Sequence, residues 1–303
     1  MDYNFETVNC IICGSDNTYP VSDKGQFNLP ANVVLCKECG LGYLNPRWDK
    51  NSYLNFYKNE YDKYYRPHII DKKAGKAVRD NDIIKRFERY NLFPEHVNNI
   101  LDIGSGEGTN LSDLGEHFHE SKLFAIEPSL TAQNNLKGSG IILVSDSIDS
   151  SWTEAYKGNF DLIIMRHVAE HFMDPISALS KINGVLSDKG VIYLAVPDSL
   201  KPNQNLEKRW FRAVHTYYFN KYSLRNLMSK TGFEIIKLVE GDDFNQGELY
   251  LMARKTNNPV SLNISEDHFT IQKEIFNLRL KREGNYFHKV ISLTNRIVKK
   301  IIK

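Results

Sequence analysis

Apolar residues in the middle of the chain form short runs that are separated by amphipathic stretches. Seven of these runs predict strands, at Asn99–Ile103, Lys122–Ile126, Ile141–Val144, Asp161–Met165, Val191–Val196, Phe233–Val239 and Glu248–Ala253. Helical stretches separate the first six, a pattern typical of a parallel sheet with helices on both faces. The last two runs are joined only by residues 240–247, too few for a crossover helix, so we predict an antiparallel pair. The fold class is therefore α/β.

Two further segments precede the predicted sheet. Residues 53–65 are rich in aromatic side chains, which either cover a neighbouring hydrophobic surface or offer a stacking platform for nucleic acid. Apolar positions of helical spacing then predict a helix over 76–90, with Pro94 after its end. We divide the chain into residues 1–50, a connector over 51–94, the α/β domain over 95–256, and a tail over 257–303.

The tail is helical and basic in character. Between residues 287 and 303, one apolar stripe runs among lysines and consists of Val290, Leu293, Ile297 and Ile301. Two interpretations stay open: the helix touches an anionic membrane surface, or it packs on the domain or on a second subunit. The oligomeric state does not follow from the sequence.

Composition narrows the class of protein. The 303 residues suffice for about two domains. The 39 Lys and Arg against 37 Asp and Glu leave a net charge of +2, so no global field attracts nucleic acid, and we expect no nucleic-acid partner. The apolar runs are too short to span a bilayer, and residues 1–6 do not resemble a signal peptide. A cytoplasmic protein is expected, with peripheral contact at the inner face of the membrane as the option that the tail leaves open.

All four cysteines lie in the first forty residues, as two C-x2-C pairs separated by 22 residues: Cys10, Cys13, Cys36 and Cys39. Two such pairs suit tetrahedral Zn(II), because each tight turn presents two thiolates to one ion. Gly14 and Gly40 follow the pairs and permit the backbone of such turns. A redox C-x2-C motif or two disulfides are the alternatives. With four protein ligands the zinc would be structural, and the module would be a zinc ribbon.

The strongest functional signal is a glycine-rich turn between a predicted strand and a helix. Gly104, Gly106 and Gly108 stand at alternate positions, one residue tighter than the dinucleotide motif G-x-G-x-x-G. Asp102 lies two residues before the first glycine. A carboxylate there would repel a pyrophosphate and attract a cationic sulfonium, so the combination disfavours NAD.

Acidic residues also follow the next two predicted strands. Glu127 ends the second strand, where a carboxylate can accept both hydroxyl protons of a ribose. Asp146 follows the third strand and could accept an adenine amino group, with Ile148 beside the ring, although aspartate is also a common turn residue.

These features resemble class I S-adenosylmethionine (SAM)-dependent methyltransferases over residues 95–255. The resemblance rests on the glycine loop, on Glu127 and on residues 160–171 (FDLIIMRHVAEH), 189–197 (KGVIYLAVP) and 231–235 (TGFEI). The cysteine module followed by residues 40–47 (GLGYLNPR) resembles the zinc-ribbon subgroup, many of whose members are bacterial and belong to sugar or surface-polysaccharide pathways.

The resemblance implies a Rossmann-like, seven-stranded sheet of order 3-2-1-4-5-7-6, with SAM across the ends of strands one and two. Asp102 and the loop would line its methionine part, Glu127 its ribose and Asp146 its adenine, while the backbone after Met165 closes the pocket. The full set of expected cofactor-binding residues is Asp102, Gly104, Ser105, Gly106, Gly108, Glu127, Pro128, Asp146, Ser147 and Arg166.

Methyl transfer to a hydroxyl needs an aligned acceptor and a base, but no metal. His167 and His171, predicted one helical turn apart after strand four, and His215 are the candidate bases, with His215 preferred. His171 could instead only pack the helix, and His215 could only order its loop. The aromatic residues expected to wall the acceptor pocket or form a lid are Trp210, Phe211, Tyr217 and Tyr218.

The acceptor is expected to be a small molecule. No Asn/Asp-Pro-Pro-aromatic motif follows strand four, which weakens base N-methylation, and with all cysteines assigned to zinc no nucleophile remains for C5-pyrimidine chemistry. The sequence favours methylation of a hydroxyl on a sugar, nucleotide-sugar or surface-glycan precursor. Methylation of a carbon or an amine is less favoured. A zinc-ribbon RNA methyltransferase and a non-catalytic SAM-binding protein are the alternatives.

Overall fold

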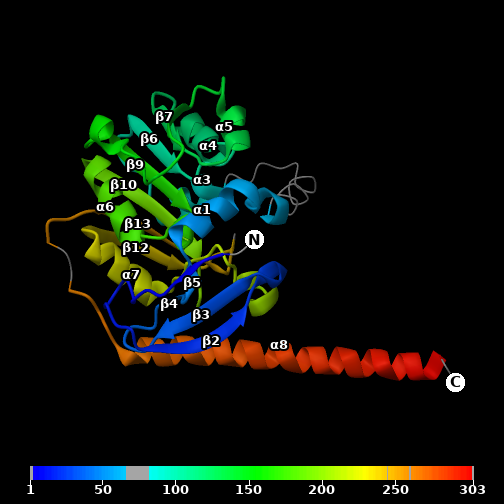
Figure 1. Cartoon of the computed structure of the whole chain (residues 1–303). Coiled ribbons are helices and arrows are strands. Elements are labelled where there is room, and N and C mark those ends of the chain that lie inside the picture. The colour runs from blue at the N-terminus through cyan, green and yellow to red at the C-terminus, as the bar shows by residue number, and fades with distance from the viewer. Residues whose placement is uncertain (1–2, 66–81, 244, 259–260, 302–303) are drawn as a thin grey trace.

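A seven-stranded sheet forms the centre of the structure (Figure 1). The structure, a computed structural model, describes residues 3–65, 82–243, 245–258 and 261–301. In spatial order the strands are β12 (Phe233–Glu240), β13 (Glu248–Lys255), β10 (Leu186–Pro197), β9 (Phe160–Arg166), β6 (Asn99–Ile103), β7 (Lys122–Ile126) and β8 (Ile142–Ser145). Strand β13 runs antiparallel to both β10 and β12, and the other pairs are parallel. The predicted strands, their order 3-2-1-4-5-7-6 and the antiparallel pair are confirmed.

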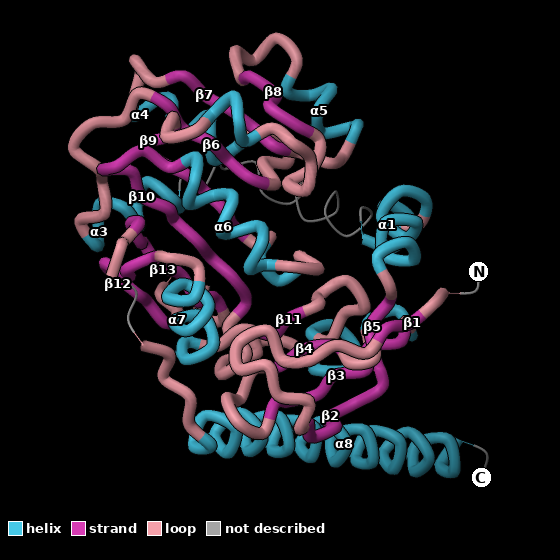
Figure 2. Tube along the Cα trace, turned by 60° about the vertical axis from the view of Figure 1, so that its left-hand side comes forward, coloured by secondary structure: helices cyan, strands magenta, loops and turns pink. Residues whose placement is uncertain are grey.

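Helices cover both faces of this sheet (Figure 2). One face packs against α3 (Asp82–Tyr90), α4 (Thr109–His117) and α5 (Leu130–Leu136), and the other against α6 (Pro175–Val185) and α7 (Lys221–Lys230). Neighbouring residues of β6 enter different cores: Ile100 packs on the α4 face and Leu101 on the α6 face. Burial on both faces explains why the strands have continuous apolar sequences. The helix predicted over 76–90 is present over 82–90, and its first part lies outside the described residues.

The cysteine module forms a second, four-stranded sheet. Its order is β11 (Tyr217–Tyr218), β4 (Gly42–Leu44), β3 (Pro30–Cys36) and β2 (Thr18–Lys24), all antiparallel. Strands β1 (Phe5–Glu6) and β5 (Arg47–Trp48) pair separately. Because β11 comes from the chain beyond β10, the N-terminal module and the central domain share one sheet.

The aromatic stretch lies on α1 (Lys50–Asn59) and on the helical residues 61–65 that follow it. Tyr53, Phe56 and Tyr65 are buried in a cluster with Trp48 and Val214. These rings therefore cover a hydrophobic surface of the protein.

The last helix, α8 (Glu266–Ile301), runs along β2 and β3 and extends beyond the body of the protein (Figures 1 and 2). Phe276 of α8 packs edge to face on Phe211, with the ring centroids 5.4 Å apart. Within the described residues, no helix combines the length and the apolar character that crossing a membrane requires.

The four aromatic residues expected at the acceptor pocket are all buried in the protein. Trp210, Phe211 and Tyr218 belong to a core that joins β3 and β4 to α8. Tyr217 packs in the core of the α7 face, and its hydroxyl accepts a hydrogen bond from Arg47 Nη1 at 3.1 Å. That they wall an acceptor pocket stays a prediction, while the structure shows that segments distant in sequence cover them, which aromatic character alone does not reveal.

Candidate functional site

The glycine loop follows β6 at the carboxyl edge of the sheet. Gly104, Gly106 and Gly108 all have left-handed backbones, with φ of 73°, 56° and 76°. A Cβ at Gly104 would clash with Val168, and one at Gly108 would come within 2.8 Å of Leu136. At Gly106 a Cβ would meet nothing within 4 Å. Gly108 is therefore required for packing of α4 on its neighbours, whereas Gly106 leaves open space of the kind that a ligand needs.

Two buried carboxyl groups flank this loop. Asp102 Oδ2 accepts a hydrogen bond from Asn110 Nδ2 at 3.3 Å, and burial raises the pKa of Asp102 to about 7. Glu127 accepts hydrogen bonds from the N–H groups of Gly106 at 2.7 Å and Ser129 at 2.8 Å. Burial raises the pKa of Glu127, and these two bonds oppose the rise. Each oxygen of Glu127 keeps a second lone pair for a ligand hydroxyl.

The remaining residues expected to bind the cofactor lie at the same edge. Ser105 is buried, and its Oγ has no hydrogen-bond partner. Pro128 and Asp146 are exposed after β7 and β8, with the half-buried Ser147 beside Asp146. Asp102, Glu127 and Asp146 thus follow three neighbouring strands, as the sequence suggested.

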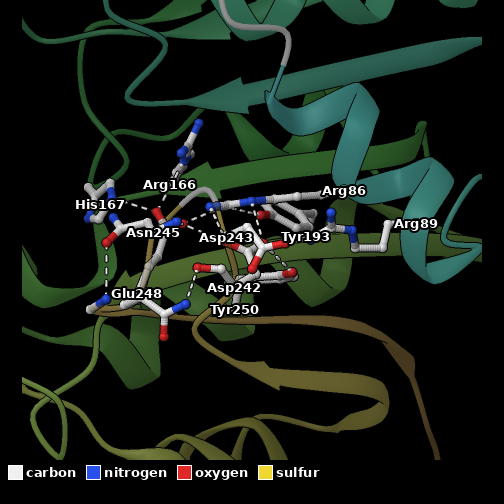
Figure 3. Close-up of polar contacts among 12 residues, drawn as sticks. Arg86, Arg89, Arg166, His167, Tyr193, Asp242, Asp243, Asn245, Glu248 and Tyr250 are labelled. Atoms are coloured by element: carbon white, nitrogen blue, oxygen red, sulfur yellow. Dashed lines mark hydrogen bonds and ion pairs between the residues drawn. The ribbon is translucent and has the colours of Figure 1, made fainter.

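Arg166 and His167, which end and follow β9, belong to an ionic network around a buried carboxylate that the sequence did not reveal (Figure 3). At its centre, Glu248 of β13 is fully buried. Its Oε1 lies 2.7 Å from His167 Nε2 and 3.3 Å from Arg166 Nε, and its Oε2 pairs with Arg86 of α3. Arg86 also pairs with Asp242 at 3.1 Å. The network joins α3, β13 and the end of β9.

The network fixes the protonation state of His167. Burial lowers the pKa of His167, but its contacts with Glu170 and Glu248 outweigh this effect and raise the pKa to about 9. Burial likewise raises the pKa of Glu248, while the contact with His167 and the charges of Arg166 and Arg86 lower it to about 2. His167 is a cation at neutral pH, so it is unsuited to the role of base that the sequence suggested.

The backbone at His167 also differs from the prediction. His167 has φ of 56°, and a short 3-10 helix begins only at Ala169 and ends at His171. The two histidines are therefore not related by a helical turn. Ion pairs with Glu248 and with Glu170, at 3.6 Å from His167 Nδ1, stabilise this left-handed residue.

His171 and His215 lie together, although 44 positions separate them in the sequence. Their rings meet edge to face with centroids 4.6 Å apart. His171 Nδ1 lies 3.0 Å from the carbonyl oxygen of Val214, which can only accept, so we assign the proton of neutral His171 to Nδ1. Nε2 of His171 then carries the lone pair, 4.0 Å from Glu170 Oε1.

Both of these histidines are neutral at neutral pH. Burial lowers the pKa of His171, and it lowers that of His215 further together with the charges of His171 and Arg212. Val168 connects His171 to the glycine loop, because its side chain fills the position of a Gly104 Cβ and its carbonyl accepts a hydrogen bond from the His171 N–H at 2.9 Å. A pair of neutral imidazoles therefore stands beside the predicted cofactor site.

Sequence reasoning missed Arg212 and three tyrosines at this site. Tyr57, Tyr61 and Tyr65 are four residues apart, and their rings stack with centroid distances of 4.7 and 4.9 Å. Tyr57 OH lies 2.8 Å from His171 Nδ1. The regular spacing of the tyrosines was a usable signal, because residues at i and i+4 share one face of a helix.

The four cysteine sulfurs converge at the N-terminal end of the chain. Cys10 Sγ lies 3.5 Å from Cys39 Sγ, Cys13 Sγ lies 3.4 Å from Cys36 Sγ, and all four lie within 4.8 Å of one another. No disulfide joins them. Tetrahedral zinc–sulfur bonds of about 2.3 Å place the sulfurs about 3.8 Å apart, so the cluster suits Zn(II).

Comparison with known proteins agrees with this geometry. The family model described as "Methyltransferase domain" matches residues 74–238, more than half of the chain. The chain belongs to the methyltransferase domain family. Its sheet order and glycine loop are those of class I, SAM-dependent methyltransferases. A search of curated proteins found no match.

Solved structures with this methyltransferase fold share little sequence with the chain. The plantazolicin methyltransferase BpumL, in complex with S-adenosylhomocysteine (SAH) and a triazolic desmethylPZN analogue, is 16% identical over 68% of this chain and 95% of its own, with a TM-score of 0.54. BpumL with SAH alone gives the same identity and score over 94% of its length. A SAM-dependent methyltransferase from Mesorhizobium loti is 14% identical over 55% of this chain and 96% of its own, with a TM-score of 0.45.

Proposed function

We propose that the protein transfers the methyl group of SAM to a hydroxyl of a small acceptor, namely a sugar, a nucleotide-sugar or a surface-glycan precursor. The observation that carries this proposal is the position of His171 and His215. Both are neutral, His215 is buried and His171 half-buried, and the N–H of His171 donates to the carbonyl of Val168, whose side chain contacts the glycine loop. A proton acceptor at this position would serve an acceptor hydroxyl that reacts beside the glycine loop.

The loop and its carboxylates suit SAM. When bound, SAM supplies a methyl group made electrophilic by its positive sulfur. Asp102 offers a carboxylate to the cationic methionine part, and the open space at Gly106 admits it beside the backbone. Glu127 would accept the ribose hydroxyls and Asp146 the adenine amino group. The buried Ser105 Oγ, which lacks a partner, is a further donor for this site.

His171 would take the proton from the acceptor. Its Nδ1–H is held by the carbonyl of Val214, so Nε2 is the atom free to accept. Glu170 Oε1, 4.0 Å from Nε2, would stabilise the imidazolium that forms. His215 packs against the His171 ring and would position the acceptor.

We further propose that the four cysteines hold a structural Zn(II). Four thiolates complete its coordination, so the ion would stabilise the module without taking part in the reaction. Metal analysis of the purified chain should give one zinc per protein.

Transfer of labelled methyl tests the proposed reaction. Purified protein and labelled SAM are incubated with sugars, nucleotide-sugars, a glycan extract and RNA, and the products are separated with and without nuclease. We expect label in a nuclease-resistant sugar fraction, lost in Asp102→Asn and reduced strongly in His171→Asn. Label that nuclease releases would favour the RNA alternative, and SAM binding without transfer to any acceptor would favour the non-catalytic one.

A further inference from the structure

Arg212 is connected to both neutral histidines by a continuous series of contacts. His171 contacts Tyr57, the first ring of the tyrosine stack. Tyr65, the last ring of this stack, has its ring centroid 5.8 Å from the Arg212 guanidinium. On the other side, the His215 N–H donates to the Arg212 carbonyl at 3.0 Å within a turn. The His215 ring in turn packs against the His171 ring. The cation is therefore fixed relative to both histidines.

The backbone of Arg212 is anchored at both of its polar groups. Its N–H donates to Tyr218 OH at 3.0 Å, and Tyr218 OH donates to its carbonyl at 3.3 Å. The side-chain Nε donates to the carbonyl of Arg209 at 3.1 Å. These bonds hold the side chain in place and use only one of its five N–H donors.

Arg212 differs from the other cations near the site, because among the described residues it has no acidic partner. Arg86, Arg166 and His167 are each paired with Glu248. Arg212 is half-buried, yet none of the described carboxylates lies within 4 Å of it. A half-buried guanidinium that is held in place without a counter-ion favours binding of an external anion.

The hydroxyl of Tyr65 is a second group that favours binding of an external anion. Tyr65 is 6% exposed, and its hydroxyl has no hydrogen-bond partner in the part of the chain that the structure describes. Leaving a buried hydroxyl unpaired costs free energy, which a ligand oxygen would recover. Tyr65 and Arg212 together offer O–H and N–H donors and no competing carboxylate.

We propose that Arg212 and Tyr65 form an anion-binding subsite for the acceptor, which takes a phosphoryl or carboxylate group attached to the sugar. This inference rests on the proposed function and narrows its substrate class to charged acceptors. Glu170 is the nearest carboxylate of the histidine cluster, and it faces the cationic His167, at 3.6 Å. Its charge is thereby compensated, so it does not prevent an anion from binding at Arg212.

Calorimetry on the full-length, SAH-loaded protein tests the subsite. Pyrophosphate and glucuronate are titrated separately at constant ionic strength into wild type, Arg212→Gln, Arg212→Lys and Tyr65→Phe. Arg209→Gln is the matched control, because Arg209 is exposed, three residues away, and contributes only its carbonyl. We expect about tenfold or greater loss of affinity in Arg212→Gln, partial recovery in Arg212→Lys, a several-fold loss in Tyr65→Phe, and no change in the control.

The two probes separate the sources of the anion. Tighter binding of pyrophosphate indicates a phosphorylated or nucleotide-linked sugar, and tighter binding of glucuronate indicates an acidic sugar. If neither anion binds to the SAH-loaded wild type, or if Arg212→Gln binds both as tightly, the subsite is refuted while the proposed reaction stands. Failure of the wild type to bind SAH would instead refute the proposed function.

Discussion

Tyr217 is the antiparallel partner of Tyr43 in the β4–β11 ladder. Tyr43 lies four residues after Cys39, and Tyr217 lies two residues after His215. The ladder therefore joins the cysteine module directly to the segment that carries one of the two neutral histidines. The glycine loop, in contrast, lies between β6 and α4 of the central domain.

The first prediction concerns loss of the proposed zinc. Cys39→Ser should lose the metal and loosen β4, and with it β11 and His215. Because small displacements of a reacting group lower rates strongly, we expect kcat to fall about tenfold to a hundredfold. SAM affinity, measured by calorimetry, should change by less than about threefold, because the central domain is intact. Equal loss of SAM affinity and kcat would contradict this separation.

The second prediction follows from the pKa of Asp102, which burial raises to about 7. Below pH 7 the carboxyl is neutral and no longer attracts the cationic part of SAM. The dissociation constant of SAM should therefore be constant above pH 7 and rise up to about tenfold per unit below it. Asp102→Asn should bind weakly at every pH, and a parallel pH profile for the two proteins would refute the assignment.

Asp102 should also lower the stability of the ligand-free protein. Its folded-state pKa exceeds that of the unfolded chain, so its protonated form favours folding, and stability falls as the pH rises from about 4 to 7. At pH 8, Asp102→Asn should be more stable than wild type by roughly 1 to 4 kcal/mol in denaturant unfolding without SAM. A destabilised variant would show that the buried carboxylate is compensated in the apo protein.

The third prediction distinguishes two effects of a Gly→Ala substitution in the glycine loop: strain of the backbone, and loss of the space that the cofactor would occupy. Gly106 and Gly138 both have positive φ, 56° and 81°, and a Cβ at either would meet nothing within 4 Å. Gly138 lies between α5 and β8, at the opposite edge of the sheet. Each Gly→Ala substitution should cost about 1 kcal/mol of stability. Only Gly106→Ala should also weaken SAM binding, by about tenfold or more, and equal affinities in the two variants would place SAM elsewhere.

The sequence predicted the features that depend on local pattern. Strands buried on both faces have continuous apolar runs, and the acids that follow β6, β7 and β8 meet because carboxyl ends of parallel strands share an edge. The contacts of Arg212 and Glu248 could not be predicted, because their partners are tens of residues away in sequence. The packing of Trp210 and Phe211 in one cluster with Phe276 of α8 could not be predicted for the same reason.

The fourth prediction concerns Glu248, whose carboxylate accepts from Arg86, Arg166 and His167 in a fully buried position. Glu248→Gln removes one charge and leaves Arg86 with Asp242 as its acidic partner. Breaking a buried ion pair in this way costs about 3 to 5 kcal/mol. Glu234→Gln is the matched control, because Glu234 pairs with Arg254 at 2.9 Å on the surface, where solvent screens the pair, and it should change stability far less. Denaturant unfolding at pH 7 compares the two variants.

The same network makes stability depend on the charge of His167. Its folded-state pKa of about 9 lies above the unfolded value, so its contribution is fully present below about pH 6.5 and disappears as the pH rises through 9. The imidazole is partly exposed, which weakens the effect without changing its sign. His167→Asn keeps a residue that tolerates φ of 56° and removes the titrating group. Between pH 7 and 10 the wild type should therefore lose more stability than His167→Asn, and identical pH profiles would show that His167 is not held as a cation by Glu170 and Glu248.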